Sequence, residues 1–163
     1  MDKAREQSIL CYINWIARRT DFVGPCVRDL MARTVVTDVR VPGLSGCCWA
    51  WRGAHDQAQR ARIKIGGKCR QVRRLVLEAT GEPLTSSDHV VSLCQNPSCV
   101  NRAHLVRGTA QERRALGRNG RIGLGDLWVA KTILSDREAT ADSLASLLGV
   151  STRFLAEAAE RVA

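Results

Sequence analysis

A cysteine and histidine motif in the middle of the chain limits its fold more than any other sequence feature. Cys94 and Cys99 flank an Asn-Pro turn, and His104 follows five residues after the second cysteine. Thiolate sulfur and imidazole nitrogen are the ligands that Zn²⁺ prefers, and three of them at this spacing can surround one tetrahedral ion. The motif therefore predicts a zinc site that holds this part of the chain in place.

A structural zinc ion takes four ligands, so one more is expected from elsewhere in the chain. Cys48 opens a predicted strand that ends at Trp51 and is the expected fourth ligand, with the adjacent Cys47 as the alternative. One ion would then join distant segments, and the binding energy of such an ion is on the order of 10 kcal/mol. Zinc is therefore expected as a structural cofactor.

The cysteines are expected to be reduced. The chain has seven of them, but its first residues are charged and form no apolar run of the kind that marks a secretory signal. The longest apolar stretch, residues 9–17, is too short and too polar to span a bilayer. We therefore expect a cytoplasmic chain with no membrane partner, whose thiols bind metal rather than form disulfides.

Positive charge is the second constraint on function. The 163 residues include 25 Lys and Arg against 16 Asp and Glu, which gives a net charge of +9. Such a balance favours an anionic partner, most often nucleic acid. Aromatic residues make up only 4% of the chain, so a platform for stacking bases is not expected.

The periodicity of apolar residues predicts a chain of mixed α and β structure. Residues 72–80 carry helical spacing, and residues 61–65 alternate as a half-buried strand does before a Gly66-Gly67 hairpin turn. Further helices are predicted over residues 5–19 and 25–33, and further strands over residues 35–41 and 48–51. The Gly- and Arg-rich residues 117–125 have the composition of a linker.

The last segment carries the spacing of two short helices with a tight turn. Ala145 lets the helices approach, Gly149 permits a left-handed turn, and Ser151 is a good N-cap for the second helix. Residues 126–163 thereby resemble the helix-turn-helix of repressors and resolvases, which implies that the second helix enters a DNA major groove. The implied DNA contacts are Ser151, Thr152 and Arg153. The alternative is a plain helical hairpin that packs on the core or forms a dimer.

Four stretches around the zinc motif share the pattern of a known family. They are Gly46-Cys-Cys-Trp-Ala-Trp-Arg-Gly-Ala54, Ala61-Arg-Ile-Lys-Ile65, Val72-Arg-Arg-Leu75, and Val90-Val-Ser-Leu-Cys94 through Leu105. The chain thereby resembles the HNH or His-Cys-box nucleases of the ββα-metal, or His-Me finger, group. The resemblance implies an α+β fold in which a zinc-bound ββα-metal core carries a small antiparallel sheet. The expected divisions are an N-terminal helical segment (1–45), an HNH-like zinc-binding domain (46–116), a linker (117–125) and a helix-turn-helix domain (126–163).

Departures from the family pattern fall on the positions that the resemblance associates with catalysis. Ser92 stands where these nucleases carry the histidine that deprotonates water, and a serine hydroxyl is no base near neutral pH. Val91 takes the neighbouring aspartate position, and Arg113 takes that of an asparagine that holds the catalytic Mg²⁺, which a guanidinium repels. Arg73 replaces a histidine of the preceding helix. The resemblance thus implies a nuclease fold that has lost its reaction.

An active nuclease is the alternative interpretation. Asp88 and His89 form a pair three residues upstream of the usual positions, and a change of register would bring His89 toward the position of the general base. Glu112 would then supply an oxygen ligand to Mg²⁺, and the chain would be a homing-type endonuclease or nickase. A third hypothesis is an interaction module whose basic surface meets an acidic protein or RNA.

The expected function is that of a sequence-specific protein that binds double-stranded DNA, a transcriptional regulator built on an inactive HNH nuclease fold with structural zinc. We expect a homodimer, because helix-turn-helix proteins usually bind paired half-sites. The chain is expected to be encoded by a bacterium or phage and to associate with the nucleoid. Further DNA contacts are expected from Arg60, Arg62, Lys64, Lys68, Arg70, Arg73, Arg74, Arg113 and Arg114.

Overall fold

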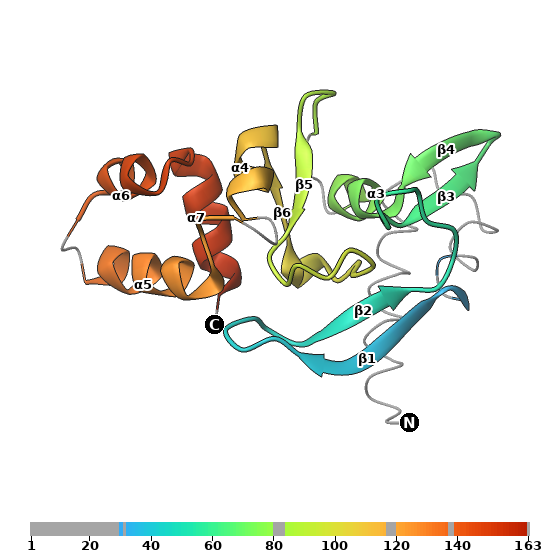
Figure 1. The fold of residues 1–163 in the computed structure, drawn as a ribbon, viewed down its shortest axis with the longest axis horizontal. Coiled ribbons are helices and arrows are strands. Elements are labelled where there is room, and N and C mark those ends of the chain that lie inside the picture. The colour runs from blue at the N-terminus through green and yellow to red at the C-terminus, as the bar shows by residue number, and fades with distance from the viewer. Residues whose placement is uncertain (1–29, 31, 80–83, 117–119, 137–138, 163) are drawn as a thin grey trace.

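The computed structural model describes residues 30, 32–79, 84–116, 120–136 and 139–162 (Figure 1). The helix expected over residues 5–19 lies outside this part of the chain, as does most of the one expected over residues 25–33. The described part combines helices with small antiparallel sheets, so the expected α+β class is confirmed. None of its helices has the length and apolar character that crossing a membrane requires.

Three hairpins make up the sheets of the described residues, and each is a two-stranded antiparallel sheet. Their strands are β1 (Thr34–Arg40) with β2 (Cys47–Trp51), β3 (Arg62–Ile65) with β4 (Lys68–Gln71), and β5 (His89–Ser92) with β6 (Leu105–Gly108). The strands expected over residues 35–41, 48–51 and 61–65 are therefore present with bounds that differ by at most one residue. The β5–β6 hairpin lies between the C-terminal helices and the β3–β4 hairpin, whereas the turn between β1 and β2 reaches the C-terminal end of the chain, where Leu44 forms a bridge with Val162 (Figure 1).

Glycines set the turns of the first two hairpins. The turn between β1 and β2 contains Gly43 and Gly46 with φ angles of +81° and +78°, and the turn between β3 and β4 contains Gly66 and Gly67 at +55° and +79°. Glycine adopts such angles without the steric cost of a side chain. The first turn reverses the chain so that β2 carries Cys48 into the interior, where it is fully buried.

Helix α3 (Val72–Ala79) follows β4 directly and packs into one of two apolar clusters. Its residues Val72 and Leu75 are 1% and 2% exposed and share this cluster with Trp51 of β2 and Leu105 of β6. Burial of such side chains contributes about 1.5 to 3 kcal/mol each. The cluster therefore fixes α3 beside the strands on which the predicted zinc motif depends.

Two strands and a helix follow one another in the middle of the molecule: β5, β6 and α4 (Ala110–Ala115). The zinc motif forms the connection between the two strands and ends in a short 3₁₀ helix, η1 (Arg102–His104). Thr109 caps α4, because its hydroxyl accepts a hydrogen bond from the Glu112 amide while the Glu112 carboxylate accepts one from the Thr109 amide. The pairing of β5 with β6 therefore holds both ends of the connection that carries the zinc motif.

The C-terminal part of the described chain holds three helices, α5 (Leu124–Ser135), α6 (Ala141–Leu148) and α7 (Thr152–Arg161). Gly149 ends α6 in the left-handed conformation with a φ of +68°, as expected. The Ser151 hydroxyl accepts a hydrogen bond from the Phe154 amide and so caps α7. Helix α7 contacts α5 and α6 and also β6, so it lies between the other helices and the β5–β6 hairpin (Figure 1).

A second apolar cluster joins the C-terminal helices to the β5–β6 hairpin. Phe154 of α7 is fully buried and belongs to the same cluster as Val91 of β5 and Val106 of β6. Ile122, from the segment 117–125 that composition predicts to be a linker, is 3% exposed and belongs to this cluster as well. One continuous core therefore holds α7 in place against β5 and β6.

Candidate metal centre and arginine-lined cavity

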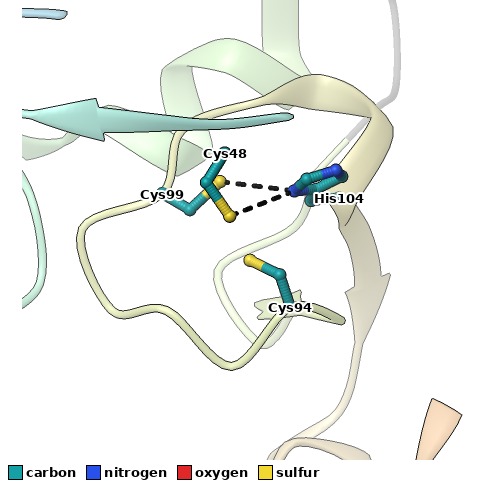
Figure 2. A group of neighbouring side chains, drawn as sticks. All are labelled: Cys48, Cys94, Cys99 and His104. Atoms are coloured by element: carbon teal, nitrogen blue, oxygen red, sulfur yellow. Dashed lines mark hydrogen bonds between the residues drawn. The ribbon is translucent and has the colours of Figure 1, made fainter. Parts of the chain in front are cut away.

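The four side chains predicted as zinc ligands lie in one cluster. Strand β2 supplies Cys48, the connection after β5 supplies Cys94 and Cys99, and η1 supplies His104. The three sulfur atoms and a ring nitrogen all lie within 4.8 Å of one another (Figure 2). These four residues form a potential metal-binding site, as the sequence predicts.

Distances within the cluster match those of a tetrahedral metal site. The Nδ1 atom of His104 lies 3.7 Å from the Sγ atom of Cys48 and 3.6 Å from that of Cys99. A zinc ion with Zn–S bonds of about 2.3 Å and Zn–N bonds of about 2.0 Å places sulfur and nitrogen ligands about 3.5 Å apart. The side chains therefore hold the separations that one shared ion requires.

The orientation of His104 also suits a metal ligand. Its Nε2 atom lies 3.1 Å from the carbonyl oxygen of Ser45. Because a carbonyl oxygen only accepts hydrogen bonds, Nε2 carries the ring proton and Nδ1 keeps its lone pair toward the sulfur atoms. Backbone carbonyls commonly hold metal-bound histidines in this way.

The three thiols resist full ionisation in the absence of a cation. Hydrogen bonding with Cys99 lowers the pKa of Cys94 to about 3, whereas burial raises the pKa of Cys48 to about 11. The hydrogen bond to Cys94, together with burial, also raises the pKa of Cys99. One thiolate forms readily, and a divalent cation stabilises the second and third by binding all of them. The sulfur and nitrogen donor set fits zinc.

The loop between the two later cysteines is shaped by Asn96. Its side-chain oxygen accepts a hydrogen bond from the Ser98 amide at 3.0 Å, and its carbonyl accepts one from the Cys99 amide at 3.1 Å. Asparagine favours such turns because its side chain bonds to backbone groups two residues later. This turn directs Cys99 back toward Cys94.

Cys47, the alternative fourth ligand, lies outside the metal cluster. Neighbouring residues of a strand point to opposite faces, so only one of Cys47 and Cys48 faces the other ligands. The buried Asn101 supports this arrangement, because its side-chain amide donates to the Cys47 carbonyl at 2.8 Å while its oxygen accepts from the Ala103 amide at 3.0 Å. Sequence reasoning missed Asn101, although an asparagine before a short helical turn is a typical N-cap.

A cavity of about 690 Å³ lies among β5, α3, α4 and the β3–β4 hairpin. Arginines make up much of its wall: Arg60, Arg62, Arg70, Arg73, Arg74 and Arg113. Among the residues that the structure describes, Asp88 is the only acidic side chain in that wall. An excess of cationic groups around a concave surface favours an anionic ligand.

The positions that the family resemblance associates with catalysis meet at this cavity. Ser92, Val91, Arg73 and Arg113 all line it, although they come from three separate elements. His89, the alternative general base, lines it as well. In the sequence these residues are linked only through the family resemblance, whereas in the structure they line the same cavity.

Most of the cavity arginines have partners. Asp56 pairs with Arg60 at 2.8 Å and with Arg62 at 3.2 Å. Glu78 pairs in the same way with Arg70 at 2.8 Å and with Arg74 at 3.0 Å. Arg113 is exposed, and no carboxylate of the described residues pairs with it. Of the cavity arginines, its guanidinium is therefore well placed to meet an external anion.

Three further residues predicted to contact DNA lie outside the cavity wall. Lys64 and Lys68 are exposed near the tip of the β3–β4 hairpin, and Arg114 is exposed on α4. Their ammonium and guanidinium groups extend the positive surface around the cavity. Exposed cations are common on proteins, so these three residues alone do not indicate a DNA-binding surface.

The predicted DNA contacts at the start of α7 face carboxylates of the protein itself. The Ser151 hydroxyl donates to Glu112 at 2.5 Å, the Thr152 hydroxyl donates to Asp142 at 2.7 Å, and the Arg153 guanidinium lies 3.8 Å from Asp88 and 3.9 Å from Glu157. The hydrogen-bond donors that a helix-turn-helix would direct to DNA are therefore paired with carboxylates of the protein. They also hold α7 to α4, to α6 and to the segment before β5.

Fold and site together define an α+β protein with a Cys₃His site suited to a metal ion. The chain is similar to Protein 7.7 of Escherichia phage T7, with 29% identity over 121 residues that cover 70% of this chain and 93% of the phage protein. No protein-family model matches the chain. No solved structure matches it either.

Proposed function

We propose that the chain is a zinc-stabilised protein that binds double-stranded DNA on an HNH-like scaffold and does not cleave it. The observation that carries the proposal is the meeting of Ser92, Arg73 and Arg113 at one arginine-lined cavity. The exposed guanidinium of Arg113 can bind phosphate, whereas none of the three side chains accepts a proton from water at neutral pH or holds Mg²⁺. The scaffold is thereby suited to binding without reaction.

Zinc has a structural role in this proposal. The residues Cys48, Cys94, Cys99 and His104 supply four ligands, and a site with four protein ligands has no open position for water or substrate. The ion would join β2 to the β5–β6 connection and so support the wall of the cavity. Its chemistry when bound is limited to holding these segments together.

Phosphate contacts are assigned to the cavity and to the β3–β4 hairpin beside it. Arg113 offers an exposed guanidinium at the cavity, and Lys64 and Lys68 offer ammonium groups on the hairpin. If about six cations contact phosphates, the logarithm of affinity falls against the logarithm of salt concentration with a slope near −5. Sequence preference would come from side chains that reach the grooves between these contacts.

The α6–α7 pair has a smaller part in DNA contact than its helix-turn-helix spacing implies. The donors of Ser151 and Thr152 bond to carboxylates of the protein, and the exposed stripe of α7 contains Ala156 and Glu160. A carboxylate on that stripe repels phosphate. These contacts favour the alternative in which the pair packs on the core.

The proposal is tested by replacing one cavity arginine and one matched arginine. Arg113→Gln removes an exposed guanidinium at the cavity, and Arg40→Gln removes an exposed guanidinium from β1. Loss of a phosphate contact weakens binding to all duplex sequences and reduces the salt slope by about 1. Titration of labelled duplexes at several salt concentrations is expected to show this for Arg113→Gln alone. Equal binding curves for the two variants contradict the assignment.

A second candidate function is an active endonuclease with His89 as general base. The observation in its favour is that His89 lines the cavity and that burial, together with Arg113 and Arg60, lowers its pKa, so the ring is neutral near pH 7. In the described part of the chain, however, the zinc cluster is the only group of three or more His, Cys, Asp or Glu that can hold an ion. Glu112, the expected Mg²⁺ ligand, is 2% exposed and bonds to Ser151. Mg²⁺-dependent scission abolished by His89→Ala would establish this function.

The biological setting belongs to the proposal as well. Similarity to a phage protein fits a phage-encoded chain. A regulatory role at the nucleoid of a bacterial cell is part of the proposal and depends on the proposed binding to DNA. The homodimer expected from the helix-turn-helix spacing stays a prediction. An interaction module for an acidic protein or RNA remains a third hypothesis, and a salt-insensitive complex with a protein partner would separate it from the two DNA-based functions.

A further inference from the structure

Arg73 points away from solvent and toward the zinc loop. Its Nε atom donates to the carbonyl oxygen of Cys99 at 2.8 Å, and a terminal nitrogen of the same guanidinium donates to the carbonyl oxygen of Asn96. The side chain therefore spans the loop between Cys94 and Cys99 from its place in the first turn of α3. Neither of these two donors is available to an external phosphate.

The charge expected at the metal centre gives a physical reason for a guanidinium beside the zinc loop. Zn²⁺ bound by three thiolates and one neutral imidazole has a net charge of −1, and most of this cluster is buried. A buried charge is costly unless an opposite charge lies nearby. The guanidinium of Arg73 supplies a positive charge close to this cluster, since it donates to the carbonyl oxygen of the ligand Cys99 itself.

We propose that Arg73 is a positioning residue of the zinc centre: its guanidinium balances the negative charge of the metal–thiolate cluster and holds the loop that carries two of the ligands. The inference rests on the zinc site, not on DNA binding, and it separates Arg73 from the other arginines of the cavity. It also assigns Arg73 a role that differs from the phosphate contact expected from sequence. The proposed phosphate contacts remain with Arg113 and with Lys64 and Lys68 of the β3–β4 hairpin.

The neighbouring Arg74 is a matched control within the same helix. Its Nε atom pairs with Glu78 at 3.0 Å, and its terminal nitrogens donate to the carbonyl oxygens of Asp88 and Thr85 at 3.1 and 2.6 Å. Arg74 thus also uses several donors and lines the same cavity. Its hydrogen bonds within the described residues go to Glu78, Asp88 and Thr85, not to the zinc loop, so loss of its charge is expected to leave the metal centre unchanged.

The test measures zinc release from the full-length chain to an excess of a chromogenic chelator. Wild type, Arg73→Gln, Arg73→Lys and Arg74→Gln are each loaded with zinc, and the metal content of the wild type is measured first. A wild-type chain without zinc would contradict the zinc site itself. A zinc-loaded wild type permits a separate test of Arg73. Circular dichroism shows whether each variant folds, and Co²⁺ replacement shows by its sulfur charge-transfer band whether the ligand set is kept.

Arg73→Gln is expected to release zinc about 10- to 100-fold faster than wild type, as loss of outer partners of a metal site usually does. Arg73→Lys is expected to lie between them, because it keeps the charge but cannot reach both carbonyl oxygens. Arg74→Gln is expected to match wild type. A wild-type release rate for Arg73→Gln, or equal acceleration by Arg74→Gln, overturns the proposal. If Arg73→Gln does not fold, Arg73→Lys decides by the same criterion.

Discussion

The carboxylate of Glu112 accepts hydrogen bonds from both the amide and the hydroxyl of Ser151, at 2.9 and 2.5 Å. Glu112 belongs to α4 and Ser151 caps α7, so one buried side chain joins the β5–β6–α4 unit to the C-terminal helices. The same carboxylate completes the capping box at Thr109. This contact, together with the shared apolar core, sets the position of α7.

Replacement of Ser151 by alanine is expected to destabilise the chain by about 1 to 3 kcal/mol, because α7 loses its cap and a buried carboxylate loses one donor. Denaturant unfolding followed by circular dichroism measures the change. Ser146→Ala, at an exposed position of α6, is the matched control and is expected to change stability by less than about 0.5 kcal/mol. Similar losses of unfolding free energy for the two variants would show that the bond between Ser151 and Glu112 does not stabilise the fold.

Stability is expected to depend on the ionisation of Glu112. Burial opposes ionisation, but hydrogen bonds from Ser151 and Thr109 outweigh it, so the pKa of Glu112 lies below its ordinary value of 4.5. The ionised carboxylate therefore stabilises the fold above about pH 4.5, and this contribution is lost as the pH falls through the folded-state pKa. The stability advantage of wild type over Glu112→Gln is expected to be constant near neutral pH and to shrink below about pH 4.5. An advantage that does not change with pH contradicts the assignment.

Zinc content is expected to distinguish the two adjacent cysteines. Cys48→Ser removes a ligand of the metal cluster, whereas Cys47→Ser changes a buried residue outside it. Metal analysis of the purified chains is expected to find one zinc per chain in wild type and in Cys47→Ser, with strongly reduced content in Cys48→Ser. The reverse order would make Cys47 the fourth ligand.

His89 offers a spectroscopic test of the cavity. Burial and nearby arginines hold the pKa of its ring below the ordinary value of 6.5. A bound phosphate adds negative charge beside the ring and stabilises its protonated form, so the pKa of His89 is expected to rise when duplex DNA binds. NMR titration of the ring protons with and without DNA measures this change. An unchanged titration in saturated complexes would place the DNA elsewhere.

Local sequence signals predicted much of the fold. The spacing of Cys94, Cys99 and His104 indicated the metal cluster, because ligand type and separation are properties of a short segment. Glycines at Gly66-Gly67 and Gly149 marked turns for the same reason, since their backbone angles are local requirements. The choice of Cys48 over Cys47 needed the direction of β2, which sequence left open.

Long-range contacts could not be predicted in this way. The bond between Glu112 and Ser151 joins residues 39 positions apart, and no periodicity reports such a pairing. An arginine such as Arg73 is expected to be a surface cation, yet its guanidinium turns inward to the carbonyl oxygens of the zinc loop. Composition around Ile122 indicated a linker, whereas the side chain of Ile122 itself lies in the apolar core.

The central claim is that the scaffold binds duplex DNA but lacks the groups for cleavage. The most direct test incubates the zinc-loaded chain with a random-sequence duplex library and Mg²⁺, then sequences both the bound intact molecules and any new ends. The account predicts an enriched motif without new ends, and a palindromic motif would support a dimer. New ends at a fixed offset from an enriched motif would contradict it and would make His89 the first candidate for the general base.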